Sequence, residues 1–242
     1  MSQKKTKSLQ KLLDTAKDID TKKWFENYLK HEIKFRGLKT PLVTKIVKDW
    51  LKEETISSDE LLEVTKILFQ SKYAEDKYAG SIIINLKLLH QENYQEIISQ
   101  CSEALEAGHF YEWSSTDWLC VRVLSPIVQS SKKCAKEISS WHKSENLWKR
   151  RASIVSFKDS AKKSDQYHPV ISKIAQKLIK EQERFIQTGI GWTMCEASKN
   201  YPEYSENFFR SNLKYCSLEI ITRHAKFLPC HQELKNLKKA LI

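Results

Sequence analysis

The scarcity of glycine and proline is the feature that most limits what this chain can fold into. Only five Gly and five Pro occur among its 242 residues. A fold made of many β-hairpins needs Gly- and Pro-rich turns between its strands, and this chain cannot supply them. We therefore expect a chain of helices joined by short connections.

Apolar residues recur at three- and four-residue spacing along most of the chain, as on one face of an α-helix. The triplet Ile82-Ile83-Ile84 resembles a buried strand, but the apolar run continues to Leu89 without a turn signal, so we predict helix there. The expected helices are Ser8–Lys17 (weakly amphipathic), Thr21–Phe35, Pro41–Leu51, Ser58–Leu68, Glu75–His90, Tyr94–Leu105, Ser115–Gln129, Cys134–His142, Leu147–Phe157, Val170–Ile179, Arg184–Lys199, Tyr204–Leu213, Cys216–Phe227 and Gln232–Leu241.

Short helices with short connections are typical of antiparallel helix pairs stacked in sequence. We expect an all-α fold, a HEAT-like or armadillo-type α-solenoid with degenerate repeats and a concave basic face. A compact helical bundle is the alternative. Gly37 is expected to stop one helix, with Thr40 as N-cap and Pro41 as first residue of the next. Residues 1–242 are predicted to form a single domain, in which 158–168 is the only linker-like segment.

The charge balance points to a polyanionic partner. Lys and Arg number 41 against 30 Asp and Glu, a formal net charge of +11. An excess of this size favours nucleic acid, because neutralising phosphates releases counterions. A basic protein at a membrane surface is the alternative. No apolar run is long enough to span a bilayer, and the basic N-terminus lacks the apolar core of a secretory signal.

The six cysteines are scattered and form no C-x-x-C pair, which suits a reducing compartment. Cys216, His224, Cys230 and His231 lie near one another in sequence but not at the spacing of a zinc site. We expect buried thiols, exposed histidines, and neither a metal nor another cofactor. The expected location is cytoplasmic, in the bacterial cytosol or nucleoid, or nuclear if the source is eukaryotic.

Two charged residues fall on apolar helix faces. Asp117 precedes Val121 by one turn and lies on the inward side of its helix. Either it serves the helix start, since Ser114-x-x-Asp117 resembles a capping box, or it is functional. Arg151 lies among the apolar residues of its own helix and needs an anion, either a carboxylate in a structural ion pair or a phosphate. Its neighbours Lys149 and Arg150 are expected to be solvated.

Gly189 and Gly191 stand within one turn of Trp192 inside an otherwise good helix. Because each interior Gly costs roughly 1 kcal/mol relative to Ala, the pair predicts clearance for a neighbouring helix or a ligand. Trp113 and Trp192 are open to two interpretations, since tryptophans are most often part of the core.

Four motifs follow one another along the chain: Tyr28-Leu-Lys-His-Glu-Ile-Lys-Phe-Arg-Gly-Leu-Lys-Thr-Pro41, Trp113-x-x-x-Asp117, residues 146–154 and residues 186–192. In this order they make the chain, from about Trp24 to Phe227, resemble the bacterial DNA alkylation repair glycosylases of the AlkD type, whose N-terminal signature is similar to the first motif. Trp113-x-x-x-Asp117 matches its Trp and catalytic Asp. Residues 146–154 resemble its Trp-x-x-Arg-Ala segment, and 186–192 match the segment that ends in its second active-site Trp.

The resemblance implies roles for these residues. Asp117 would be the catalytic carboxylate between the indoles of Trp113 and Trp192. Arg151 and Tyr28 would contact DNA, and we expect contributions from the basic side chains Lys149, Arg150, Arg223 and His224. Ser114 replaces an acidic residue of the family pattern, and segment 217–224 lacks its usual basic position but keeps Arg223 and His224.

An alkylated purine that carries a positive charge leaves readily, so the remaining barrier is the oxocarbenium character of the deoxyribose. A carboxylate near C1′ stabilises that charge and orients the attacking water. The indoles would cup the sugar and the cation, and lysines would supply sequence-independent affinity. The expected partner is double-stranded DNA containing alkylated purines, bound by a monomer. The alternatives are a non-catalytic HEAT-like module for damaged or branched DNA and a protein-interaction scaffold.

Overall fold

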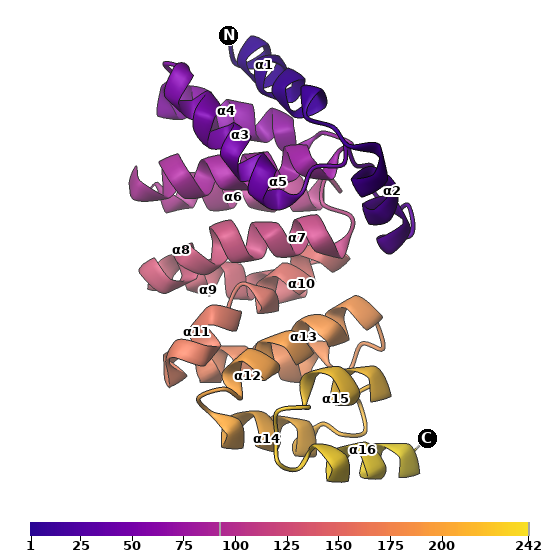
Figure 1. The fold of residues 1–242 in the computed structure, drawn as a ribbon. Helices are drawn as coiled ribbons and strands as arrows, with labels where there is room; N and C mark the ends of the chain where they lie inside the picture. Colours follow the sequence, from indigo (N-terminus) through magenta and orange to yellow (C-terminus); the bar gives the residue numbers. More distant parts are fainter. Residues whose placement is uncertain (92, 242) are drawn as a thin grey trace. The chain divides into compact units, whose positions relative to one another are not determined.

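A computed structural model describes residues 1–91 and 93–241, and within that range it contains no strand beyond a single isolated bridge, Lys34–Tyr73. The all-α class is therefore confirmed (Figure 1). None of the described helices is long and apolar enough to cross a membrane. The fold divides into two compact units, an N-terminal unit (Met1–Val123) and a C-terminal unit (Leu124–Ile242). That residues 1–242 act as one domain stays a prediction.

The N-terminal unit is built around α5, which contacts α3, α4 and α7, while α4 also contacts α1 and α6. All ten residues of α5 are buried, and the predicted helical state of Ile82–Ile84 is confirmed. The helices of this unit are α1 (Ser2–Thr15), α2 (Ile19–Tyr28), α3 (Thr40–Glu53), α4 (Ser58–Phe69), α5 (Ala74–Ile83), α6 (Tyr94–Glu106) and α7 (Trp113–Leu119), with a π-helical turn at Ile84–Leu88 and a 3-10 turn at Leu89–Gln91.

In the C-terminal unit α13 is central and contacts α10, α11, α14 and α15. The helices are α8 (Ser125–Ser130), α9 (Lys132–Ser140), α10 (Leu147–Val155), α11 (Lys158–Lys163), α12 (His168–Leu178), α13 (Arg184–Ala197), α14 (Pro202–Ser211), α15 (Leu218–His224) and α16 (His231–Ala240), with 3-10 turns at Trp141–Lys143 and Asp165–Tyr167. The prediction of a linker at 158–168 is wrong. Ala161 is fully buried in α11, so packing against α13 makes this polar segment helical.

The predicted helix Thr21–Phe35 ends earlier, at Tyr28. The N–H of Lys30 donates to the carbonyl of Asn27 (3.0 Å) and that of His31 to the carbonyl of Glu26 (2.7 Å). These two bonds form a Schellman motif, in which a left-handed residue closes the helix. Lys30 has φ 52° and His31 φ 60°, so a lysine occupies the position that glycine usually takes.

After that turn the chain continues to α3 without regular secondary structure, and its backbone is held by the buried carboxylate of Glu75 at the start of α5. One oxygen of Glu75 accepts the N–H groups of Arg36 (3.0 Å), Gly37 (2.8 Å) and Leu38 (3.0 Å). Gly37 has φ 101°, and a Cβ on it would lie 1.9 Å from the carbonyl oxygen of Asp18, so only glycine fits. The prediction that Gly37 stops the preceding helix is wrong, because that helix already ends at Tyr28. The start of α3 also differs from the prediction: Lys39 is the N-cap, Thr40 the first helical residue and Pro41 the second.

The predicted helix Ser115–Gln129 is also interrupted. After α7 comes a π-helical segment, Cys120–Leu124, and Pro126 then lies in the first turn of α8. Proline has no N–H to offer the carbonyl of Arg122 one turn earlier. That carbonyl instead accepts a hydrogen bond from Nδ2 of Asn85 (2.8 Å). The interruption therefore follows from the missing donor and leaves α7 as a short helix.

Candidate nucleic-acid interface

Helix α7 carries Trp113 and Asp117, and its start is fixed by Glu112. The Glu112 carboxylate accepts the N–H groups of Ser114 (2.5 Å) and Ser115 (2.7 Å), so Glu112 is the N-cap and Trp113 the first helical residue. The interpretation of Ser114-x-x-Asp117 as a capping box is therefore wrong. Asp117 lies beyond the first turn, and its carboxylate is not the cap of its own helix.

Glu112 is itself held in the core, where it is only 2% exposed. Lys77 is a buried residue of α5 whose Nζ donates to the carbonyl of Phe69 (2.6 Å). Burial lowers the pKa of Lys77 to about 8, while the attraction of Glu112 and Asp76 opposes that shift. The start of α7 is thus fixed by the two backbone N–H groups that Glu112 accepts, and the attraction to Lys77 of α5 favours the negative charge there.

Trp113 and Asp117 are four residues apart and share one face of α7, where both are partly exposed. The ring of Tyr28 meets Trp113 edge-on with centroids 5.8 Å apart, and it stacks on Trp24 at 5.2 Å. Ser114, on another side of the helix, is bonded to the hydroxyl of Tyr78 (2.8 Å). The N-terminal unit therefore brings together three predicted site residues, Tyr28, Trp113 and Asp117.

In the C-terminal unit Arg151 of α10 is 4% exposed, as its place among apolar residues predicts. Its Nη1 donates to the carbonyl of Phe185 and to Oγ1 of Thr188 (3.2 Å), both on α13. A Cβ on Gly189 would lie 3.1 Å from that same nitrogen. Gly189 therefore provides the clearance that lets the Arg151 guanidinium lie along α13.

Gly191 does the same for α15, because a Cβ there would meet the side chains of His224 and Ile220 at 2.6 Å. The predicted clearance for neighbours is confirmed at both glycines. Trp192 follows directly and is partly exposed, with Nζ of Lys158 5.0 Å from its ring centroid. Sequence reasoning missed Lys158, because the segment that contains it was interpreted as a linker.

The other predicted DNA contacts differ in their surroundings. Arg150 is not fully solvated as expected: it pairs with Glu181 (3.1 Å) and donates to the carbonyls of Ser144 and Glu145. Lys149 lies over the ring of Trp141 at 5.5 Å. Arg223 is exposed and pairs with Glu219 (2.7 Å).

His224, at the end of α15, gives a test of this packing by pH. Burial lowers its pKa from the usual 6.5 to about 4, and the charges of Arg223 and Arg151 act in the same direction. Because the unfolded chain binds the proton at higher pH, the stability from neutral His224 is present above pH 6.5 and lost as the pH falls toward 4. Thermal melts should therefore show Tm falling more steeply over this range in the wild type than in His224→Asn. Equal slopes would contradict the burial of His224.

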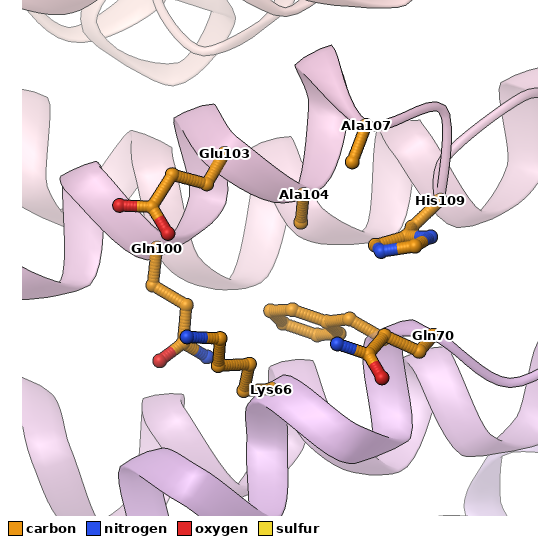
Figure 2. A pocket seen from close by; sticks show the side chains of 8 residues that line it. Lys66, Gln70, Gln100, Glu103, Ala104, Ala107 and His109 are labelled. Atoms are coloured by element: carbon orange, nitrogen blue, oxygen red, sulfur yellow. The ribbon is translucent and has the colours of Figure 1, made fainter.

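A separate cavity of about 140 Å³ lies in the N-terminal unit between α4 and α6. Figure 2 shows Lys66, Gln70 and His109 at its edge, with the amide of Gln100, which is 2.7 Å from the Thr65 hydroxyl, at one side. No predicted site residue lines it. No cluster of three or more metal-ligating side chains occurs among the described residues, and the cysteines there are buried.

The geometry defines an all-helical protein with a carboxylate and aromatic rings on one unit and a basic, indole-bearing helix group on the other. A family model for DNA alkylation repair enzymes matches residues 9–226. The chain belongs to that family. A solved structure described as a predicted DNA alkylation repair enzyme from Enterococcus faecalis is similar in fold, with a TM-score of 0.70 at 21% identity, covering 91% of this chain and 95% of that one. A comparison with curated proteins finds no match.

Proposed function

We propose that this protein is a DNA glycosylase that excises cationic N3- or N7-alkylated purines from duplex DNA. Membership of a DNA alkylation repair family supports alkylated DNA as the substrate class. The observation that carries the glycosylase activity is Asp117, a partly exposed carboxylate that shares a helix face with Trp113 and is not the cap of its helix. Such a group suits a transition state that develops positive charge.

In this mechanism Asp117 lies near C1′ of the damaged nucleotide, stabilises the oxocarbenium-like sugar and orients the attacking water. A cationic base needs no general acid to leave, so one carboxylate is enough. The indole of Trp113 lines the same face and would contact the sugar and the cationic base, and Trp192 of the C-terminal unit stays a proposed catalytic residue.

Arg151 is proposed to hold a backbone phosphate, with its bonds to α13 fixing the direction of the guanidinium. Lys149, Arg150, Arg223 and His224 stay predicted DNA contacts. Arg150 and Arg223 already pair with glutamates. Each should therefore contribute less to DNA affinity than a cation without a carboxylate partner would contribute. The net charge of +11 supports a duplex partner bound with strong salt dependence. A monomer without cofactor, placed in the cytosol or nucleus, belongs to the same proposal.

The test is release of 7-methylguanine from a duplex that contains one such base, measured by chromatography of the freed base. We expect release from this duplex and none from matched duplexes that carry guanine or the neutral lesion O6-methylguanine. Salt-dependent binding without release would contradict the enzyme and support a non-catalytic module. Absence of DNA binding would contradict both and support a protein-interaction scaffold.

A further inference from the structure

Helix α2 exposes aromatic rings that the core does not use. None of its ten residues is buried, and the large aromatic side chains of Trp24 and Tyr28 are 60% and 58% exposed. Large aromatic side chains normally build a core or an interface, so two adjacent ones left in water mark a binding surface. The sequence predicts Tyr28, but not Trp24, as a site residue.

The exposed rings form an ordered stack. Trp24 and Tyr28 lie nearly parallel, with centroids 5.2 Å apart and an interplanar angle of 10°, and Tyr28 in turn meets Trp113 edge-on. Phe25 contacts Trp24 at right angles (5.0 Å, 81°) and stacks on the buried Phe35. Trp24 and Tyr28 therefore form a stacked pair whose Tyr28 ring contacts Trp113 edge-on, and Phe25 packs against Trp24 from the side.

Two lysines flank the exposed rings in sequence. Lys23 precedes Trp24 directly, Lys30 follows Tyr28 by two residues in the left-handed turn after α2, and both are exposed. Of the nearby carboxylates, Glu26 accepts from the N–H of Phe35 (3.1 Å) and lies within 4.0 Å of Lys22, while Asp20 and Glu32 are exposed. A flat apolar ring with exposed lysines close to it in sequence complements a nucleotide, which offers a π-face between phosphates.

We propose that Trp24 is a platform on which one unpaired nucleobase of DNA stacks, with Lys23 and Lys30 near the flanking phosphates. Stacking on an indole is tolerant of sequence, because every base has a π-face, which suits a protein that must act at lesions in any context. The choice of DNA as partner rests on the proposed function. The stacking itself rests on the geometry of α2.

The test uses a duplex with a single unpaired 2-aminopurine, whose fluorescence falls when it stacks, and the fully paired duplex as reference. Trp24→Ala should weaken binding of the bulged duplex about five-fold or more and abolish the fluorescence change. Trp24→Phe should keep part of both. The matched control is Ile19→Ala, on the same helix and equally exposed at 60% but aliphatic, which should bind like the wild type. Neither substitution removes a core contact, so both variants should fold.

Two outcomes would overturn the platform. In the first, Trp24→Ala and Ile19→Ala bind the bulged duplex with equal affinity. In the second, Trp24→Ala lowers the affinity for the paired duplex as much as the affinity for the bulged duplex. Release of 7-methylguanine is measured separately on the wild type. If the wild type stacks the unpaired base through Trp24 but releases no 7-methylguanine, the platform stands and the glycosylase proposal fails. If it releases the base and Trp24→Ala behaves like Ile19→Ala, the glycosylase stands and the platform fails.

Discussion

Asp117→Asn is expected to lower the single-turnover rate of 7-methylguanine release by about 100-fold or more, the usual effect of removing one group aimed at developing charge. The substitution keeps the shape and hydrogen-bonding capacity of the side chain but removes its negative charge. Since Glu112 and not Asp117 caps α7, the helix start should be unaffected. Affinity for the lesion-containing duplex should be kept, or increase slightly, because a carboxylate near the phosphates is gone.

Asp49→Asn is the matched control for this experiment. Asp49 is a partly exposed aspartate of α3 whose pairing with Lys52 (3.2 Å) is at the surface, and such pairs contribute little to stability. It should release the base at the wild-type rate. If the Asp117→Asn protein binds the duplex and releases 7-methylguanine at a rate within a few-fold of the wild-type rate, the carboxylate has no part in the mechanism. Equal Tm values for both variants would exclude unfolding as the cause of a loss.

The features that sequence predicted well depend on spacing within one helix. The inward position of Arg151 follows from its place among Leu147, Ile154 and Val155, and no tertiary information is needed to see it. The two glycines of α13 predicted clearance for the same reason, since an unfavourable residue inside a helix needs a compensating contact. The all-helical class likewise follows from apolar spacing summed over many segments.

The features that sequence missed depend on the folded geometry rather than on residue preference. Glutamate is not among the favoured N-cap residues, yet Glu112 and Glu183 cap α7 and α13 by accepting backbone N–H groups of the first turn. Helix α2 ends at Tyr28 and is closed by Lys30 in the left-handed conformation, so no glycine marks the stop. The position of Trp24 likewise depends on Tyr28 and Phe25 together. In each case the folded geometry differs from the preference that a local pattern expresses.

Glu75→Ala is expected to have the largest effect on stability. The Glu75 carboxylate is fully buried and accepts the backbone N–H groups of Arg36, Gly37 and Leu38. Alanine would leave three buried donors without an acceptor, at roughly 1–3 kcal/mol each, or roughly 3–9 kcal/mol together. Because a folded domain is stable by only about 5–15 kcal/mol, this loss is large enough to unfold the N-terminal unit. Urea denaturation followed by circular dichroism measures it.

Glu75→Gln separates the hydrogen bonds from the charge. A glutamine oxygen can still accept from all three N–H groups, but neutral bonds contribute less than those to a carboxylate, so a smaller loss is expected. Glu63→Ala, an exposed position on α4, should stay near the wild type. If Glu75→Ala were as stable as Glu63→Ala, the segment after α2 would not be held by this carboxylate. Tyr28 and Trp24 directly precede the segment that Glu75 holds. If Glu75→Gln holds that segment less firmly, stacking of the unpaired base on Trp24 should also weaken. The stability of this connection would then be linked to the aromatic surface that it supports.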